Sequence, residues 1–311
     1  MYLVTGGAGF IGSHLVHELV KRNQRVRVLD NFSTGRRANL TALPNHVEII
    51  EGDIRDQAVV ASAMRGVEYV LHQAALASVT LSVADPASTH AVNVTGTLNV
   101  LQAARDAGVR RVVFASSCAV YGNDPRLPKH EAMAAAPLSP YAASKLAGEA
   151  YCRAFTEVYG LPTVALRYFN VFGPRQDPAS PYSAVIPRFI AAALAGEPLT
   201  IYGDGTQSRD FVYVSNVVSA NLLACTAADA VGHVINVAAG RRYSLLDLVA
   251  RLRQLLGPER VQVQHLPPRP GDVLHSSASL RQARRRLDYR PQVTFARGLR
   301  ETINAMRSGP A

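Results

Sequence analysis

The sequence predicts an α/β fold in which a doubly wound parallel sheet is joined to a smaller, discontinuous α/β region. The first half of the chain alternates short apolar runs, rich in β-branched residues, with longer segments of helical period. Three glycines stand where the first apolar run meets the first helical segment. After residue 167 prolines become frequent and the alternation is lost, which predicts a second region of different architecture.

The individual elements follow in chain order. Buried strands are expected at residues 2–5, 25–29, 47–50, 69–72, 112–115 and 163–166, and helices at 12–21, 57–64, 96–107 and 141–158. In the second region we expect a helix at 188–195, strands at 211–214 and 234–237, and a helix capped by Ser244. These elements predict a Rossmann-type domain over residues 1–167, with a return strand near 210–237. The substrate-binding region then comprises residues 168–209 and 238–311.

The composition limits the classes of protein to consider. With 311 residues and 48% hydrophobic content, the chain can bury a full core. It opens directly on the first strand, without a basic leader, and has no apolar run of membrane-spanning length. We therefore expect a soluble, cytoplasmic protein without a membrane partner. The three cysteines are far apart and form no Cys-x-x-Cys pair, which predicts reduced thiols and no metal site.

The net charge of +10 comes mostly from arginine, because the only lysines are Lys21, Lys129 and Lys145. Nucleic-acid binding would require a basic patch with stacking aromatic residues. Here the arginines are scattered, with short runs such as those at residues 36–37 and 284–286. We therefore expect no nucleic-acid partner, and a small anionic ligand for a few of the arginines.

Tyr141 and Lys145 lie four residues apart on a predicted helix, after an apolar strand that ends at Ser116 and Ser117. Positions i and i+4 share one face of a helix, so the ammonium is expected beside the phenol. Its charge favours the phenolate and should lower the pKa of Tyr141 below the usual value of about 10. The pair therefore predicts a tyrosine that acts as a base.

Gly6, Gly9 and Gly12 mark the turn from the first strand into the first helix. Glycines let the backbone approach a pyrophosphate, and the helix N-terminus offers free N–H groups and a partial positive charge. Asp30 ends the second strand about 20 residues further on, where a carboxylate binds the adenosine ribose. That carboxylate would repel a ribose phosphate, so NAD is favoured over NADP. The arginines at 36–37 are close enough to weaken this preference, although their spacing predicts a surface position.

Asp53 and Cys118 each allow two interpretations. Asp53 follows the third strand, where its carboxylate can bind an adenine amino group, cap the next helix, or do both. Cys118 can be a nucleophile, but a lone cysteine beside a strand end is more typical of a small packed residue.

Further motifs follow in order: His72-Gln73-Ala74-Ala75, Asn93, Arg167-Tyr168-Phe169-Asn170, Gly203-Asp204-Gly205, Ser208-Arg209-Asp210 and Arg269-Pro270-Gly271-Asp272. Together with the glycine triplet, the serine pair and the Tyr141/Lys145 pair, they make the sequence similar to the extended short-chain dehydrogenase/reductase family. The resemblance is strongest to its UDP-sugar 4-epimerases and covers essentially the whole chain.

The resemblance implies that Tyr141 takes the proton of the sugar 4-hydroxyl while hydride passes from C4 to NAD. Ser117 would hydrogen-bond the same oxygen, and Lys145 would hold the nicotinamide ribose. A transient 4-keto sugar would turn over and receive the hydride on its other face, so NAD stays bound. The implied cofactor positions are Gly6, Gly9, Phe10, Ile11, Gly12, Asp30, Asn31, Ser33, Thr34, Gly35, Asp53, Ile54, Ala74, Ala75, Asn93, Tyr141, Lys145 and Phe169. The implied substrate positions are Ala77, Ser117, Asn170, Ala184, Val185, Thr200, Tyr202, Arg209, Arg269, Asp272 and Ser276.

Departures from the family pattern rank the alternatives. No carboxylate follows Ser117 in Cys118-Ala119-Val120-Tyr121, which disfavours dehydratases and decarboxylases. UDP-glucuronate 4-epimerases carry a segment similar to residues 175–178. At the position of Asn170, however, they tend to carry a different residue. A net nucleotide-sugar reductase would consume free cofactor, and a noncatalytic NAD-binding regulator would be expected to lack Tyr141 or Lys145.

Substrate size and assembly are further expectations from the resemblance. Ser276 stands where glucose-restricted members carry a bulky tyrosine, and Ala77 and Ala184 replace larger polar residues. We therefore expect turnover of UDP-glucose and UDP-galactose and also of UDP-GlcNAc and UDP-GalNAc. The family also implies a homodimer, formed through helices near 96–107 and 144–158.

Overall fold

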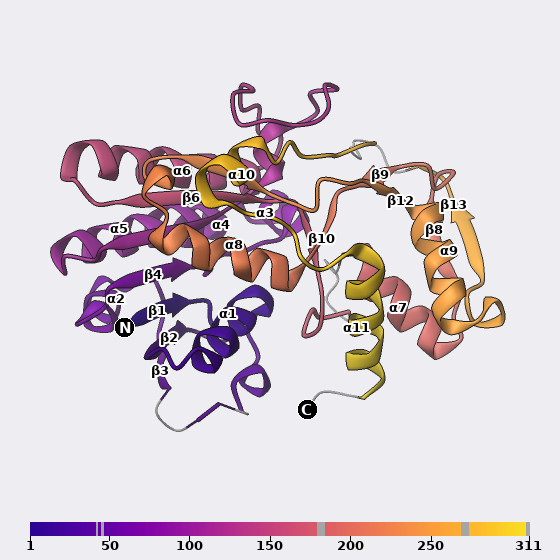
Figure 1. Cartoon of the computed structure of the whole chain (residues 1–311), viewed down its shortest axis with the longest axis horizontal. Coiled ribbons are helices and arrows are strands. Elements are labelled where there is room, and N and C mark those ends of the chain that lie inside the picture. Colours follow the sequence, from indigo (N-terminus) through magenta and orange to yellow (C-terminus); the bar gives the residue numbers. More distant parts are fainter. Residues whose placement is uncertain (42, 45–46, 179–183, 269–273, 309–311) are drawn as a thin grey trace.

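The computed structural model describes residues 1–41, 43–44, 47–178, 184–268 and 274–308. A seven-stranded sheet with strand order β11-β6-β5-β4-β1-β2-β3 forms its centre, and all its strand pairs are parallel (Figure 1). The strands are β1 (Tyr2–Thr5), β2 (Val26–Asp30), β3 (Glu48–Glu51), β4 (Tyr69–His72), β5 (Arg111–Ser117), β6 (Thr163–Tyr168) and β11 (Val234–Val237). The strand order reverses between β1 and β4, and sheets of this kind bind ligands at that point.

Helices cover both faces of the sheet, which explains its nearly continuous apolar strands. One face packs against α1 (Phe10–Lys21), α8 (Val214–Thr226) and α10 (Arg281–Leu287). The other packs against α2 (Gln57–Met64), α5 (Gly96–Asp106) and α6 (Pro140–Tyr159). Before α5 the chain forms α3 (Val79–Ala84), α4 (Pro86–His90) and a π-helical turn, Ala91–Thr95. None of the helices in the described ranges has the length and apolar character needed to cross a bilayer.

Helix α6 carries both members of the predicted catalytic pair, and local chemistry sets its ends. The side chain of Ser139 accepts a hydrogen bond from the backbone of Ala142, and Pro140 occupies the first turn. Gly160 ends the helix in the left-handed conformation, with φ of 66°.

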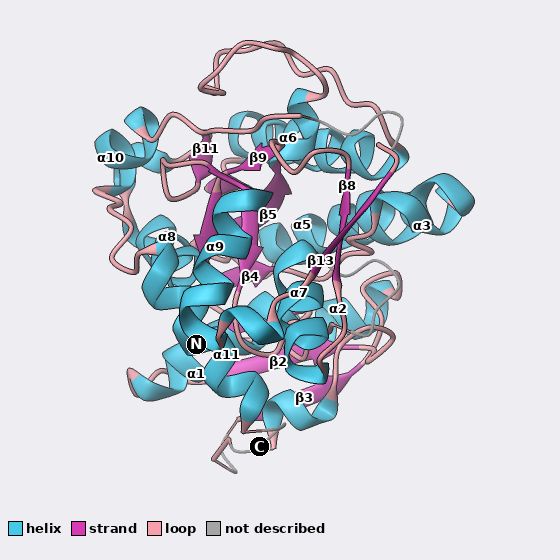
Figure 2. Cartoon of the chain, turned by 90° about the vertical axis from the view of Figure 1, so that its right-hand side faces the viewer, coloured by secondary structure: helices cyan, strands magenta, loops and turns pink. Residues whose placement is uncertain are grey.

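A second, smaller region lies at one end of the central sheet and has its own core (Figures 1 and 2). Its helices are α7 (Val185–Ala195), α9 (Leu245–Leu256) and α11 (Phe295–Arg307). Short strands pair as β7 (Asn170–Phe172) with β10 (Phe211–Tyr213), β8 (Leu199–Tyr202) with β13 (Val263–Leu266), and β9 (Ser208–Arg209) with β12 (Tyr243–Ser244). Phe172, Phe211 and Tyr243 pack around Phe295 at ring distances of 4.3 to 5.6 Å.

The predicted fold class is confirmed, and the structure corrects several details. The strand expected at 211–214 ends at Tyr213 and pairs with β7 outside the central sheet, and Val214 instead begins α8. The strand that returns to the central sheet is β11, beside β6. β5 and β6 extend to Ser117 and Tyr168, because their parallel ladder continues through these residues. Ser244 caps α9 as expected, whereas the domain boundaries remain a prediction.

Candidate active site

A cavity of about 650 Å³ opens at the carboxyl ends of the central strands. It is formed by the β1–α1 turn, the end of β2, the segment after β4, and the facing parts of β5 and α6. The expected cofactor residues that line it are Gly6, Gly9, Phe10, Ile11, Gly12, Asp30, Asn31, Ser33, Thr34, Gly35, Asp53, Ile54, Ala74, Ala75, Tyr141 and Lys145.

The β1–α1 turn requires glycine at two of these positions. Gly6 has φ of +68°, and a Cβ there would lie 2.6 Å from the backbone nitrogen of Ala74. A Cβ on Gly12 would lie 2.0 Å from the carbonyl oxygen of Gly6. The turn is therefore packed against its neighbours, and only glycine leaves its backbone open to a phosphate.

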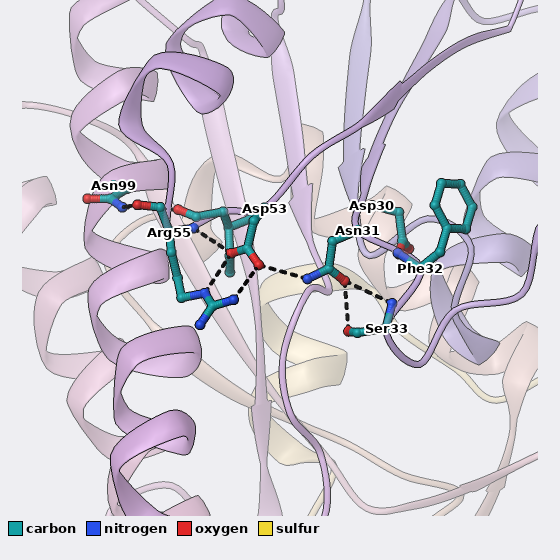
Figure 3. A network of polar contacts seen from close by, with 8 residues as sticks. Asp30, Asn31, Phe32, Ser33, Asp53, Arg55 and Asn99 are labelled. Carbon is teal, nitrogen blue, oxygen red and sulfur yellow. Dashed lines mark hydrogen bonds and ion pairs between the residues drawn. The ribbon is translucent and has the colours of Figure 1, made fainter.

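Asp30 sits at the end of β2 and is 7% exposed. Its carboxylate accepts a hydrogen bond from the backbone nitrogen of Ala8 at 2.8 Å. It accepts another from the backbone nitrogen of Phe32, also at 2.8 Å (Figure 3). These bonds fix the carboxylate against the glycine-rich turn. Each carboxylate oxygen can accept more than one hydrogen bond, so capacity remains for a ribose in the adjoining cavity.

Asp53 belongs to a polar network with Asn31 and Arg55 (Figure 3). The Asn31 side chain donates to Asp53 at 2.8 Å, and the Arg55 guanidinium grips both oxygens at 2.8 and 2.9 Å. Hydrogen bonds from Arg55 lower the pKa of Asp53 to about 2. The alternative that Asp53 caps the next helix is wrong, because Asp56 accepts the first free N–H groups of α2.

Arg36 and Arg37 are exposed, in agreement with the spacing argument. The guanidinium of Arg36 lies 2.5 Å from the carboxylate of Asp177. Arg37 pairs with Glu51 and stacks over the ring of Phe32 at 4.0 Å. Both charges are therefore neutralised by partners on this chain.

Tyr141, Lys145 and Ser117 come together where α6 faces the end of β5. The Ser117 side chain accepts a hydrogen bond from the backbone of Ala119 at 3.2 Å and lies close enough to the Tyr141 phenol to favour its ionised form. The Lys145 Nζ donates to the carbonyl oxygen of Ala115 at 2.9 Å and lies 5.9 Å from the centre of the Tyr141 ring. The predicted trio thus shares one site, in which Tyr141 and Lys145 line the cavity.

Burial governs the protonation of this pair. It raises the pKa of Tyr141 to about 12, and the nearby Ser117 side chain acts in the opposite direction without offsetting it. It also lowers the pKa of Lys145 to about 8, since the ammonium is only 4% exposed. The expected lowering of the tyrosine pKa is therefore wrong for the chain alone, because desolvation raises it and outweighs the opposing effect of Ser117.

A second cavity, of about 390 Å³, lies in the smaller region. The expected substrate residues that line it are Asn170, Ala184, Val185, Thr200, Tyr202 and Arg209. Ala184 lines both cavities, so they adjoin, and Ala77 lines the first. Ser276 is 9% exposed, and the amide of Asn170 donates to its hydroxyl at 3.4 Å. Arg269 and Asp272 lie outside the described residues.

Most of the chain, including the residues of the first cavity up to Ala184, matches a known protein family. Residues 2–238 match the NAD dependent epimerase/dehydratase family. The chain belongs to this family. The match includes the glycine-rich turn, Asp30 and the whole of α6 with its Tyr141/Lys145 pair.

Individual members of the family are similar over nearly the full length. A UDP-glucose 4-epimerase of Mycolicibacterium smegmatis is 40% identical over 310 residues, covering 98% of each chain. The solved structure of a UDP-N-acetylglucosamine 4-epimerase from Methanobrevibacter ruminantium, in complex with UDP-N-acetylmuramic acid, is 43% identical with a TM-score of 0.94, covering 99% of this chain and 98% of that one. A Thermus thermophilus UDP-glucose 4-epimerase in complex with NAD is 41% identical with a TM-score of 0.90, covering 99% of each chain.

Two of the expected cofactor residues of this family member are buried and do not line the cavity. Asn93 is 1% exposed; its amide oxygen accepts from the backbone of Leu76, and its amide nitrogen donates to the Leu76 carbonyl and to Ser144. Asn93 thus fixes a cavity-wall segment and connects it to α6. Phe169 is 3% exposed and packs in the main core.

Other residues line the first cavity without having been predicted, among them Gln73, Tyr168, Gln176 and Asp177. Tyr168 donates to Asn221 at 2.9 Å and contacts Gln73, which joins the ends of β4 and β6. Gln73 and Tyr168 lie inside the sequence motifs at residues 72–75 and 167–170. Their place in these motifs is the signal that could have identified them as site residues. Cys118 is a packed thiol, as the second interpretation held, and burial raises its pKa to about 11.

Proposed function

We propose that this protein is an NAD-dependent UDP-sugar 4-epimerase. It interconverts UDP-glucose with UDP-galactose and UDP-GlcNAc with UDP-GalNAc through a transient 4-keto sugar. The observation that carries the proposal is the position of Tyr141 and Lys145 in the wall of the first cavity, with Ser117 next to them at the end of β5, and the meeting of this cavity with the second one at Ala184. The epimerase relatives, which are similar over nearly the whole chain, support it.

The first cavity fits a dinucleotide. The packed glycines Gly6 and Gly12 leave room for a pyrophosphate but not for a side chain, and Asp30 offers oxygen lone pairs to a ribose diol. The negative charge of Asp30 disfavours a 2′-phosphate, so NAD is the proposed cofactor. Lys145 and Tyr141 stand at the opposite end, where they would meet the nicotinamide ribose.

In the proposed reaction Tyr141 takes the proton from the sugar 4-hydroxyl and later returns it. When bound, NAD would supply the hydride acceptor and, in its oxidised form, a positive charge that favours the phenolate. Ser117 orients the 4-oxygen through its hydrogen bond, and Lys145 favours the phenolate. Arg209 holds the diphosphate from the second cavity, a task suited to a planar guanidinium, and Asn170 contacts the sugar.

The decisive experiment is proton NMR of the purified protein with UDP-GlcNAc, UDP-glucose or UDP-glucuronate, without added cofactor. We expect the C4 epimers of the first two sugars to accumulate, and Tyr141→Phe to abolish the conversion. Conversion of UDP-glucuronate alone would replace the substrate assignment. No conversion of any sugar, even with added NAD, would overturn the proposal.

We also propose a homodimer located in the cytoplasm. Apolar side chains on neighbouring helices support the dimer: Val79 and Val83 on α3 are 48% and 65% exposed, and Val158 on α6 is 71% exposed. The free thiols Cys118, Cys152 and Cys225 suit a compartment that keeps cysteines reduced.

A further inference from the structure

Helix α6 presents a third polar residue in line with its predicted catalytic pair. Tyr141, Lys145 and Glu149 are spaced by four residues, so they lie along one face of the helix. Each contacts one of three consecutive residues at the end of β5. Tyr141 lies beside Ser117, and the Lys145 ammonium donates to the Ala115 carbonyl, as described above. The hydroxyl of Ser116, the residue between these two, donates to the carboxylate of Glu149.

The carboxylate of Glu149 is paired on its other side by Arg167 of β6. The Arg167 guanidinium donates through Nε and Nη2 to the two carboxylate oxygens at 2.8 and 2.7 Å. Both residues are 5% exposed, and neither lines either of the two cavities described above. Arg167 is the register partner of Ser116 in the β5–β6 ladder, and its guanidinium stacks over the ring of Tyr121 at 4.6 Å. Glu149 therefore fastens α6 to two adjacent strands at once.

A buried ion pair of this kind is a weak source of stability, because the desolvation of both charges offsets their attraction. Its value lies in directionality, since a bidentate pair fixes both distance and rotation. A small shift of α6 along β5 is the displacement that this pair resists, in addition to apolar packing and the Lys145 contact with Ala115. Such a shift would move Tyr141 and Lys145 together, because both are fixed to the same helix.

We propose that Glu149, held by Arg167, is a positioning residue that sets the register of α6 against β5 and thereby places Tyr141 and Lys145 at the reacting oxygen. For its catalytic consequence the inference rests on the proposed epimerase activity. The placement of α6 against β5 by Glu149 requires neither substrate nor cofactor.

The test replaces both partners, in Glu149→Met/Arg167→Met, so that no charge is left buried and unpaired. A purely structural role predicts that the double variant keeps both the stability and the kcat of the wild type. The positioning role predicts a melting temperature close to that of the wild type, an unchanged KM, and a kcat lowered about tenfold or more, since small misplacements of reacting groups cost this much. A double variant with the kcat of the wild type would overturn the inference.

A second measurement works without turnover. The chain has three lysines, so carbon-13 NMR of their side chains can follow Lys145, with Lys145→Met to assign the signal. If α6 loses its register and the Lys145 ammonium becomes more accessible to water, its pKa rises from about 8 toward the ordinary value, because burial is what lowers it. An unchanged titration in the double variant would contradict the inference, whatever reaction the enzyme catalyses.

A control and a milder variant complete the design. Thr156→Val/Thr163→Val removes another polar contact between α6 and β6, a 2.8 Å hydrogen bond near the far end of the helix. We expect it to change stability but neither kcat nor the Lys145 titration. Ser116→Ala removes only the β5 side of the Glu149 contact and leaves the ion pair intact. It should shift both readouts in the same direction as the double variant, by a smaller amount, and no shift would count against the inference.

Discussion

Lys145 holds an ammonium group at a position that is only 4% exposed, with the Ala115 carbonyl as its hydrogen-bond acceptor. Its pKa is about 8 in the folded chain, against an ordinary value of 10.5. Between these pH values the unfolded chain binds more protons, so folding stability rises with pH across the window. Below about pH 8 the buried charge destabilises the fold by on the order of 3 kcal/mol, at about 1.4 kcal/mol for each pKa unit.

We therefore predict that Lys145→Met raises the free energy of unfolding near neutral pH. The advantage over the wild type should shrink as the pH rises through 8 toward 10.5, because the wild-type lysine then becomes neutral in both states. Urea denaturation at a series of pH values measures this difference in the free energy of unfolding. Lys21→Met is the matched control, since Lys21 is exposed at the end of α1. Equal effects of the two substitutions would refute the prediction.

Ser276 is the residue whose size should decide the range of sugars. Its hydroxyl accepts from the amide of Asn170, which lines the second cavity, so a larger side chain there would fill space beside the proposed sugar contact. We predict that Ser276→Tyr lowers kcat/KM for UDP-GlcNAc about tenfold or more relative to UDP-glucose, and that Ser276→Ala leaves the ratio unchanged. Competition assays with both sugars measure the ratio, and an unaltered ratio in the tyrosine variant would disprove gating.

At the scale of elements, the segment after β7 connects the two regions across the first cavity. Its Asp177 pairs with Arg36 from the segment after β2, and Gln176 and Asp177 line the cavity together with Ser33. The Pro174 carbonyl lies 2.9 Å from the His14 Nε2 on α1, which must be the donor because a carbonyl can only accept. These contacts hold the segment against both sides of the proposed cofactor site.

We predict that Arg36→Ala accelerates the loss of bound NAD by at most about fivefold, the factor expected for an ion pair that is partly exposed. High salt should speed the loss from the wild type and have less effect on the variant. Arg37→Ala is the control, because Arg37 pairs with Glu51 instead. The cofactor that remains after dialysis measures retention, and equal retention by both variants would rule out this role for the ion pair.

How much the sequence predicts depends on how local the determining contacts are. Long strands and helices carry a period that can be recognised, and Gly6, Asp30, Tyr141 and Lys145 sit in motifs of fixed spacing. The two- and three-residue strands β7, β9, β10 and β12 are too short to show an alternation, so only tertiary contacts determine their pairing. For the same reason the ion pair between Arg36 and Asp177, 141 residues apart, could not be predicted.

At the scale of the whole molecule, the proposed dimer would use the same helix that carries the catalytic pair. Tyr151 and Val158 on α6 are seven residues apart, so they share one face, and they are 37% and 71% exposed. Helix α3 packs beside α6 and adds Val83, which is 65% exposed. A surface of this kind is costly to leave in water and suits an isologous interface, in which the same patch of two copies meets.

We predict that the wild type elutes as a dimer in size-exclusion chromatography with light scattering and that Tyr151→Asp/Val158→Asp is a monomer, because facing carboxylates would repel each other and could not be solvated. Leu266→Asp, at a residue of β13 that is 41% exposed, is the control and should remain dimeric. Because α6 begins with Tyr141 and Lys145, the monomer should also turn over substrate more slowly, as its helix loses the packing of the partner. A monomeric wild type would exclude this assembly, and full activity of the monomeric variant would separate assembly from catalysis.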